Sequence, residues 1–590
     1  MKKLDRWFES LSVGRQFSSE LKPHRARLAL VVVYSLVLIS LDLLRPWPIK
    51  WIFDGALLRV EQNYSTEFYL WSGVGLAIAV ALAHSGLQYV RAMSLAAVGH
   101  QVTRGLRFRL FSHLSRLSPS FHARHKSGDL LMRLMGDAPL VRTMLVDSSV
   151  ELLTRGFLIA GTLSVLVFLD PLLTLVLLVT LPILGLAVRW LSRSLAVAVR
   201  KQRRKEGALA DFLHEAIAGT RVIQSLGREK HVVQRFARNN RRDARAGLKA
   251  TRLSARLSAL VESSLGVALT GALALGSLRV ISGDLTPGEL LVFLSYVRSL
   301  LKPIRAASRH ATKIAKGTAC GHRLLEVLSQ GASVRSKPGA PLAPFAPELL
   351  AFREVSYSYD GKQPALDGFT AEFRRGERVA VVGSSGAGKS TAAALAVRLF
   401  DPDRGVVELD GEDISGLDLE SVRDRFALCL QETVLFGESI RENLLLGKPD
   451  ATDEELRAVC AEVGACRFID ELESGLDTQL GSGGVGLSGG QRKQLALARA
   501  LLRDASILIV DEPFAGLDKW SVYKLDDCLK DFARDRTVIA IAHDLDDLDS
   551  FDRILLIDGG RVVASGTHTE LTAESSLYRD VVRAAPRGLA

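Results

Sequence analysis

Apolar residues are distributed unevenly along this chain of 590 residues. The first 330 residues contain long apolar stretches separated by basic segments, whereas residues from about 350 onward contain short apolar runs between glycines and polar residues. Since a helix needs about 20 apolar residues to cross a bilayer, the pattern predicts six transmembrane helices. They lie near Leu28–Leu44, Tyr69–Val90, Leu152–Leu169, Pro171–Val188, Leu257–Ile281 and Pro287–Leu301.

Lys and Arg gather in two of the connections between these stretches. Arg104, Arg107, Arg109, Arg116, Arg124, Lys126 and Arg133 lie between the second and third spans, and Arg200, Lys201, Arg203, Arg204, Lys205, Arg238, Arg241 and Arg242 lie between the fourth and fifth. The opposite connections, at Leu57–Thr66, Asp170 and Ser282–Asp284, are short and poor in cations. Because cytoplasmic loops carry the excess of Lys and Arg, we expect both termini in the cytoplasm. The basic connections are themselves typical of helix, so the spans are predicted to continue well beyond the bilayer.

Charge separates the two halves of the chain as clearly as hydropathy does. Residues 1–330 hold 46 Lys and Arg against 21 Asp and Glu, and residues 331–590 hold 30 against 44. The basic excess therefore coincides with the apolar stretches, which indicates membrane topology and argues against a nucleic-acid partner. Leu4, Trp7, Phe8 and Leu11 have helical spacing, which favours either an amphipathic helix on the membrane surface or an ordinary surface helix.

Several ionisable residues fall within or beside the predicted spans, where charge is costly. His84, Arg155, Arg298 and Lys302 either line a cavity for an anionic or amphipathic substrate or have structural partners. Arg155 has Glu151 one turn earlier, and Lys302 and Arg305 fall where long cations reach the interface. Asp42, Arg45 and Glu262 leave the same choice open.

A proline-rich linker over residues 331–349 separates the apolar half from an α/β pattern that begins near residue 350. Within that pattern, an apolar strand over residues 378–382 leads into a glycine-rich loop and then a helix over residues 391–399. The loop matches the phosphate-binding pattern G-x-x-x-x-G-K-[ST], in which backbone N–H groups and a lysine bind phosphates and a hydroxyl binds magnesium. Its residues are Gly383, Ser384, Ser385, Gly386, Ala387, Gly388, Lys389, Ser390 and Thr391.

Two further motifs complete this chemistry. The buried strand over residues 506–512 ends in Asp511 and Glu512, which places a magnesium-binding carboxylate and a water-orienting carboxylate beside the phosphate loop. A second glycine-rich helix start follows Leu487 and consists of Ser488, Gly489, Gly490 and Gln491. One nucleotide pocket does not need two such sites. If two subunits pack head to tail across a twofold axis, the second site closes over phosphates held by the other subunit.

With these motifs the chain resembles an ATP-binding-cassette transporter of the exporter type, a half-transporter whose membrane domain precedes its nucleotide-binding domain. The resemblance covers essentially the whole chain. It implies an all-α membrane domain over residues 1–330, with six transmembrane helices, long cytoplasmic extensions and two coupling segments. An α/β P-loop cassette over residues 350–590 follows. ATP and Mg²⁺ are the implied cofactors.

The resemblance also implies roles for individual residues. Tyr359, on a strand predicted over residues 355–359, corresponds to the aromatic residue that stacks on adenine, Gln431 to the glutamine that touches magnesium, and Asp518 to the aspartate of the D-loop. His543 corresponds to the switch histidine near the γ-phosphate. The catalytic set is then Glu512, His543, Lys389 and Gln431; the metal set is Ser390, Gln431 and Asp511; and Ser488 to Gln491 form the signature.

Two segments resemble the coupling segments of the family, at residues 119–130 and at residues 215–223, and should dock on the cassette near Gln431. Departures from the family pattern occur at Ser482, where a Glu before the signature is frequent, and at Asp544, where Arg is common. Pro513-Phe514 also follows the catalytic Glu where Ala-Thr is frequent. The first departure puts the usual contact between cassette and coupling segment in doubt. Hydrolysis should survive, because the residues of the catalytic set are present.

The sequence therefore predicts an ATP-hydrolysing, multi-pass transporter of the cytoplasmic membrane, with its ATPase domain in the cytoplasm. Two copies are expected to bind two ATP between them and to alternate between inward- and outward-facing states. A heterodimer with a homologous half-transporter, an importer built on the same fold and an ATP-gated channel remain open. The cationic residues weakly favour an amphipathic cargo such as a lipid, peptide or drug-like molecule, in contact with membrane lipid.

Overall fold

A computed structural model describes residues 12–58, 64–125, 127–331, 334–359, 361–431, 433–481, 483–542 and 548–584, without side chains in parts of helices α10, α12 and α13. The chain divides into two compact units. One holds the described residues up to Ser112 together with Gly128–Ser329, and the other holds His113–Ser127 together with the described residues from Gln330 onward. The predicted N-terminal helix, Ser482, His543 and Asp544 lie outside the described residues.

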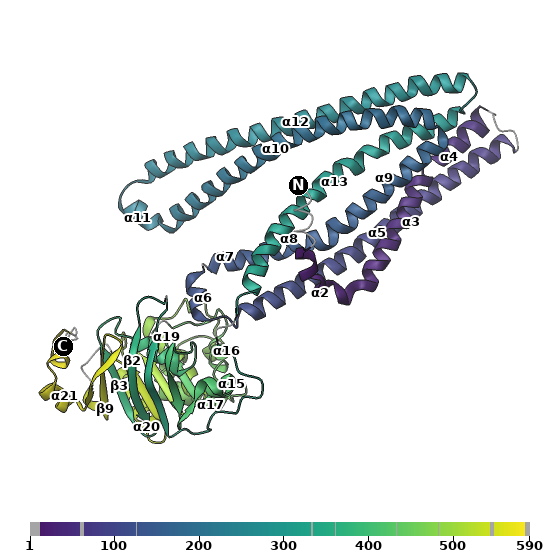
Figure 1. The fold of residues 1–590 in the computed structure, drawn as a ribbon. Helices are drawn as coiled ribbons and strands as arrows, with labels where there is room; N and C mark the ends of the chain where they lie inside the picture. The colour runs from purple at the N-terminus through teal and green to yellow at the C-terminus, as the bar shows by residue number, and fades with distance from the viewer. Residues whose placement is uncertain are drawn as a thin grey trace. The chain divides into compact units, whose positions relative to one another are not determined.

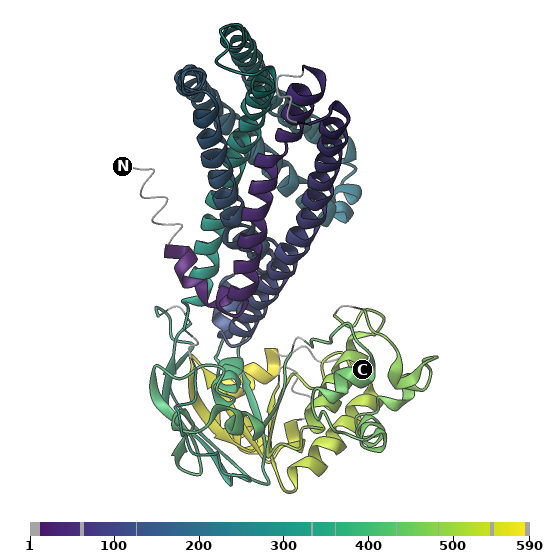
Figure 2. The same cartoon turned by 90° about the vertical axis from the view of Figure 1, so that its right-hand side faces the viewer.

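The first unit is entirely helical among the residues described (Figures 1 and 2). Its helices are α2 (Ser18–Leu21), α3 (Arg25–Leu44), α4 (Trp47–Trp51), α5 (Thr66–Leu114), α7 (Ser127–Met132), α8 (Ala138–Arg142), α9 (Ser149–Leu169), α10 (Pro171–Ala218), α11 (Thr220–Ser225), α12 (Glu229–Ile281) and α13 (Pro287–Leu328). Helix α6 (Pro119–Arg124), in the coupling segment, belongs to the second unit. A short 3₁₀ turn spans Lys22–His24, and π-helical turns span Ile52–Leu57, Arg133–Asp137 and Thr143–Ser148.

Helix length confirms that the spans extend beyond a bilayer. Helices α5, α10 and α12 have 49, 48 and 53 residues. At about 1.5 Å per residue each is roughly 70–80 Å long, more than twice the hydrocarbon thickness of about 30 Å. Helices α10 and α12 lie side by side and are joined at one end by α11 (Figure 1).

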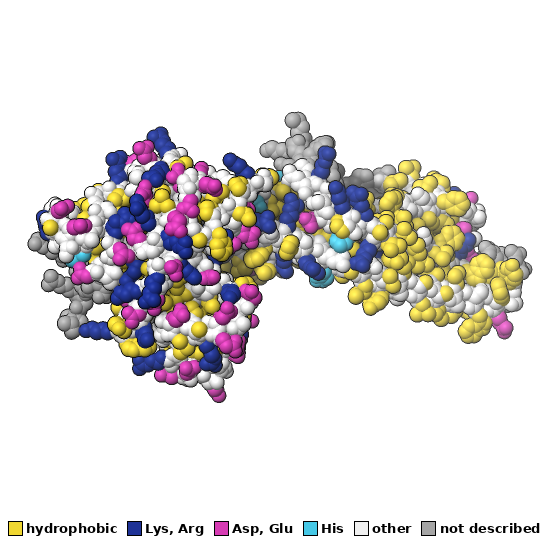
Figure 3. All heavy atoms as spheres, turned by 90° about the horizontal axis from the view of Figure 1, so that it is seen from below, with side chains coloured by type: hydrophobic (Ala, Val, Ile, Leu, Met, Phe, Trp, Pro, Cys, Tyr) yellow, Lys and Arg dark blue, Asp and Glu magenta, His cyan; other side chains and the backbone are white. Residues whose placement is uncertain are grey.

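Four helical stretches among the described residues are long and apolar enough to cross a membrane. They are Ser18–Leu57, Thr66–Leu114, Ser127–Leu169 and Glu229–Ile281, and they contain the first, second, third and fifth predicted spans. The fourth and sixth predicted spans lie in the continuous helices α10 and α13, whose side chains are only partly described. Hydrophobic side chains cover a continuous stretch of this unit's surface (Figure 3). Leu82 and Phe168 are among the exposed apolar residues of the unit.

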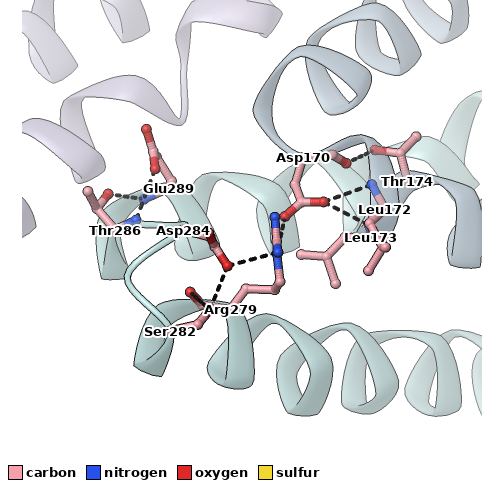
Figure 4. A network of polar contacts seen from close by, with 9 residues as sticks. All are labelled: Asp170, Leu172, Leu173, Thr174, Arg279, Ser282, Asp284, Thr286 and Glu289. Carbon is pink, nitrogen blue, oxygen red and sulfur yellow. Dashed lines mark hydrogen bonds and ion pairs between the residues drawn. The ribbon is translucent and has the colours of Figure 1, made fainter.

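The predicted turn at Asp170 is confirmed, and it belongs to a polar network (Figure 4). Oδ1 of Asp170 accepts hydrogen bonds from the backbone N–H groups of Leu172 and Leu173 at 2.8 and 3.0 Å, which caps α10. Oδ2 accepts from Nε of Arg279 at 3.0 Å, and Nη1 of Arg279 donates to Asp284 at 2.8 Å. One buried carboxylate thus joins the α9–α10 turn to the end of α12.

Three of the ambiguous membrane residues, Arg155, His84 and Asp42, have partners within the unit. Nε of Arg155 donates to Glu151 at 2.9 Å, as the spacing allowed, and Nη2 of Arg91 on α5 donates to the same carboxylate at 2.8 Å. His84 lies 3.2 Å from Asp42. The pairing predicted for Arg155 is therefore confirmed, and the pair of His84 and Asp42 was not predicted. The side chains of Lys302 and Arg305 lie outside the description.

The second unit contains two sheets. The larger has the order β10-β9-β3-β8-β7-β6, in which β10 is antiparallel and the others run parallel; the smaller is antiparallel, in the order β2-β1-β4-β5. The strands are β1 (Leu349–Tyr357), β2 (Leu366–Arg374), β3 (Arg378–Gly383), β4 (Arg404–Leu409), β5 (Glu412–Asp413), β6 (Phe426–Cys429), β7 (Ile507–Asp511), β8 (Thr537–Ile541), β9 (Arg553–Asp558) and β10 (Arg561–Gly566).

Helices and short turns connect these strands. The helices are α14 (Lys389–Ala396), α15 (Leu419–Asp424), α16 (Ile440–Leu445), α17 (Asp453–Glu462), α18 (Cys466–Ile469), α19 (Gly489–Leu501), α20 (Lys519–Ala533), α21 (His568–Glu574) and α22 (Ser576–Ala584), with 3₁₀ turns at Ile414–Gly416, Gly475–Asp477 and Leu548–Ser550. Alternate residues of β7 enter different apolar clusters: Ile507 and Ile509 pack in one, and Leu508 and Val510 in the other. The central strands are therefore buried on both faces, as the sequence predicted.

Two boundaries differ from the prediction. Strand β1 ends at Tyr357 because the N–H of Ser358 donates to the side chain of Asp403 at 2.8 Å instead of to a neighbouring strand, so Tyr359 lies beyond the strand. Helix α14 ends at Ala396 rather than Leu399 because Arg398 has φ 50°, in the left-handed region where a helix cannot continue.

Candidate functional site

The phosphate loop connects β3 to α14, as its sequence predicts. Gly386 and Gly388 have φ values of 82° and 104°, which residues with side chains rarely adopt. A Cβ atom on Gly388 would also lie 2.5 Å from the carbonyl oxygen of Ala365. Ser384, Ser385 and Ser390 are exposed, so the loop presents its backbone N–H groups and hydroxyls at the carboxyl end of β3. This is the geometry of an anion site at a helix start.

Lys389 is folded onto its own loop. Its Nζ donates to the carbonyl oxygens of Gly383 at 2.7 Å and Ser384 at 3.0 Å, and the residue is only 6% exposed. Burial lowers the pKa of Lys389, and the carboxylates of Asp511 and Glu512 oppose that shift. The lysine is therefore a buried cation held by carbonyl dipoles, placed where an anionic ligand can replace them.

The predicted metal and water-orienting residues come together at the end of β7. Oγ of Ser390 donates to Oδ2 of Asp511 at 3.0 Å, and Nε2 of Gln431 donates to Oε1 of Glu512 at 2.8 Å. A hydroxyl and a carboxylate at this distance are the oxygen ligands that Mg²⁺ prefers. Their chemistry fits the metal, and the amide of Gln431 lies beside the neighbouring carboxylate.

Glu512 has an unusual backbone. Its φ is 51°, in the left-handed region, and its N–H donates to the carbonyl oxygen of Ile541 at 2.9 Å. Nζ of Lys493, on α19, donates to the carbonyl oxygens of Glu512 at 3.1 Å and Ala515 at 2.7 Å. Sequence reasoning missed Lys493. The available signal was a cation five residues after Ser488, on a helix that otherwise buries apolar residues.

Tyr359 lies at the entrance to the phosphate loop. Its hydroxyl is 3.2 Å from Oγ1 of Thr391, and its ring packs edge-on against Tyr357 and Phe400. Tyr359 as a whole remains 43% exposed, which leaves its side chain accessible for stacking. Nη2 of Arg124, in the first coupling segment, donates to the carbonyl oxygen of Tyr359 at 2.7 Å. This contact was also missed, because residues 235 positions apart share no local pattern.

The signature residues form a helix start of their own. Oγ of Ser488 accepts from the N–H of Gln491 at 3.2 Å, and Oε1 of Gln491 accepts from the N–H of Ser488 at 2.8 Å, a capping box for α19. Ser488 and Gly489 are exposed. Within the part of the chain that the structure describes, no hydrogen bond joins these residues to the phosphate loop.

Asp518 also begins a helix. Its Oδ1 accepts from the N–H groups of Trp520 at 3.1 Å and Ser521 at 3.0 Å, which caps α20. The hydrogen bond from the N–H of Ser521 is the main reason why the pKa of Asp518 is lowered. Asp518 is thus a fixed, ionised helix cap a few residues after Ala515, whose carbonyl oxygen Lys493 contacts.

Comparisons with known proteins agree with this geometry. The family model described as the ABC transporter transmembrane region matches residues 29–304, and the model described as ABC transporter matches residues 366–515. An ATP-dependent lipid A-core flippase of Desulfotalea psychrophila is 31% identical, over 95% of this chain and 97% of its own length. Its counterpart in Thiobacillus denitrificans is 31% identical, over 94% of this chain and 95% of its own.

A solved structure is similar over the same extent. It is that of a bacterial Atm1-family ABC exporter with ATP bound, which superposes with a TM-score of 0.82 at 25% identity. The match covers 96% of this chain and 99% of that one. The likeness therefore includes both units and not the cassette alone.

Proposed function

Because the chain belongs to the ATP-binding-cassette transporters of the exporter type, and its cassette couples ATP hydrolysis to transport, we propose that two identical copies form the working transporter. Two ATP molecules bind between the cassettes, each held by the phosphate loop of one copy and the signature of the other. Closure of the cassettes converts an inward-facing cavity into an outward-facing one, and hydrolysis resets it.

The observation that carries this proposal is the unequal state of the two anion sites. At the phosphate loop, Lys389 bonds to a loop carbonyl, Ser390 bonds to Asp511, and Glu512, the next residue, bonds to Gln431. The signature has only an exposed helix start that caps itself. A helix start with free N–H groups and no catalytic neighbours can add charge stabilisation to a phosphate brought by another chain. Neither site is degenerate, which favours a homodimer over a heterodimer with a weakened partner.

The cassette residues then have distinct roles. Ser390, Asp511 and Gln431 would hold Mg²⁺, which supplies charge neutralisation at the phosphates when bound. Lys389 exchanges its carbonyl partners for the outer phosphates, and Glu512 orients the attacking water and accepts its proton. Tyr359 stacks on the adenine, Asp518 holds the D-loop, and His543 completes the set near the γ-phosphate.

Coupling to the membrane helices runs through the two cytoplasmic segments. Residues 113–127 form one compact unit with the cassette, and the bond from Arg124 to Tyr359 supports a direct connection between the first segment and the adenine site. The second segment includes the end of α10 and α11, where Ile217 and Val222 are 72% and 61% exposed. We assign these apolar side chains to docking on a cassette near Gln431.

Mixed dimers provide the test of the composite site. Lys389→Met destroys the phosphate loop of one chain and Ser488→Arg the signature of the other, and each homodimer should be nearly inactive. In the mixed dimer, the loop of the second chain faces the intact signature of the first. If mixed dimers make up about half of the population, co-expression should restore about a quarter of the wild-type ATPase activity.

Chains that carry both substitutions, co-expressed with an inactive single variant, are the control and should stay inactive. Absence of restored activity in purified, differently tagged mixed dimers would contradict a site shared between copies.

The cargo is proposed to be an amphipathic molecule, with anionic character weakly favoured, that reaches the protein from the cytoplasmic membrane. The excess of Lys and Arg in the basic connections supports a cytoplasmic location for both termini and for the cassette. The exporter relatives give the importer alternative no support. Native mass spectrometry of Glu512→Gln protein, extracted gently with ATP and magnesium, should show two 64.2 kDa chains and an additional bound mass. Passive flux through reconstituted protein without turnover would instead indicate a channel.

A further inference from the structure

Lys493 connects the signature helix to the catalytic carboxylate of the same chain. It lies on α19, five residues after the helix cap Ser488, and donates to two carbonyl oxygens of the segment that links Glu512 to the D-loop. Lys493, Asp511 and Glu512 also line the same small cavity beneath the end of β7. The lysine therefore fixes the backbone just where the catalytic side chain leaves it.

The backbone of Glu512 needs such support. A φ of 51° is unfavourable for a residue with a Cβ atom and persists only where surrounding contacts determine it. Three contacts do so: the N–H of Glu512 bonds to Ile541, its carboxylate accepts from Gln431, and its carbonyl accepts from Lys493. Since φ sets the direction of the Cα–Cβ bond, the two backbone contacts fix where the side chain leaves the chain, and the contact with Gln431 holds its carboxylate.

We infer that Lys493 is a positioning residue for Glu512, and that α19 consequently serves two ATP sites at once. The start of α19 presents Ser488 to the phosphates held by the other copy, whereas Lys493, one and a half turns later, orients the carboxylate that acts on the ATP of its own chain. The inference rests on the proposed function for this division between copies. In this role Lys493 acts through the backbone of Glu512, to whose carbonyl oxygen it donates.

Kinetics of the full-length protein test the positioning role. Lys493→Met keeps the length of the side chain but removes its donors, and it should lower kcat on the order of 10- to 100-fold, as expected when a reacting group is displaced by about an ångström. KM for ATP should change less than about twofold, because the phosphate loop is intact. Lys493→Arg, which retains donors, should recover most of kcat. Lys524→Met, on an exposed side chain of α20, is the matched control.

A kcat of Lys493→Met within about twofold of wild type would overturn the inference. So would equal losses in the Met and Arg variants together with a raised KM and a lowered melting temperature, because that pattern indicates general support of the fold.

The mixed dimers then assign the site on which Lys493 acts. Placed on the Ser488→Arg chain, whose own Glu512 serves the intact site, Lys493→Met should remove the restored activity. Placed on the Lys389→Met chain, which contributes only its signature, it should leave that activity unchanged. The reverse result would mean that Lys493 supports the signature instead. If no activity is restored even with Lys493 intact, the shared site fails, while the kcat of the single variant still decides the positioning role.

Discussion

The phosphate loop and the signature are both glycine-containing helix starts in one cassette, yet they differ in what they contact. Lys389 of the phosphate loop is 6% exposed, and Ser390 contacts the carboxylate of Asp511, on a strand more than 100 residues away in sequence. Ser488 of the signature is exposed and contacts Gln491, three residues away. The first site is built by the fold of its own chain, whereas the second is built by local geometry and, in the proposed function, is completed by a phosphate that another chain holds.

Lys389→Met should cause the largest loss, since it breaks the self-contained site. Loss of a charged phosphate donor should weaken ATP binding about 10- to 100-fold, and loss of transition-state stabilisation should lower kcat a further ~10²–10³-fold. Fluorescent-nucleotide binding and phosphate release measure the two effects. Lys524→Met is the control, and unchanged ATP affinity would show that the contacts of Lys389 within its own loop are its main role.

Ser488→Arg should lower hydrolysis about 100-fold, because a bulky cation blocks the helix start from a phosphate and removes one stabilising contact. ATP binding to the phosphate loop should remain within about threefold of wild type, since that site lies on the same chain and is intact. The matched control is Ser474→Arg, at another exposed serine that precedes a short helical turn but makes no capping bond there. If Ser488→Arg lowered ATP binding as much as it lowered hydrolysis, the phosphate loop and the signature would belong to one pocket of one chain.

Ser488→Ala should have the smallest effect. It removes the side-chain acceptor of the capping box but leaves the backbone N–H groups free, so stability should fall by about 1 kcal/mol. For a domain of this size that corresponds to a decrease of roughly 2–4 °C in the melting temperature of the cassette. Thermal denaturation without nucleotide measures it. A loss of hydrolysis as large as that of Ser488→Arg would show that the hydroxyl itself, and not access to the helix start, is required.

The local sequence pattern is sufficient to locate the phosphate loop, the signature, the acidic end of β7 and the apolar spans, because each depends on neighbouring residues and their spacing. Contacts between distant segments were not predictable in the same way. Arg91 joins Glu151 across 60 residues, and Lys493 reaches Glu512 from another helix. The sequence predicts Tyr359 on a strand, and only the bond from Ser358 to Asp403 shows why the strand ends earlier.

The left-handed backbone of Glu512 illustrates the same limit. The sequence Asp511-Glu512-Pro513 does not predict a positive φ for Glu512, because that conformation is imposed by partners on β8, on α19 and at Gln431. A motif therefore identifies the chemistry of a residue more readily than its orientation.

The network at Asp170 has a consequence for how the chain is made. Its partner Arg279 lies 109 residues later, so at roughly 5–20 residues per second the ribosome needs about 5–20 s to supply it. During that interval Oδ1 of Asp170 can already cap α10, whereas Oδ2 still lacks the arginine to which it later bonds. The α9–α10 pair can thus form before the network at its turn is complete, and Arg279 joins that turn to α12 once α12 has been made.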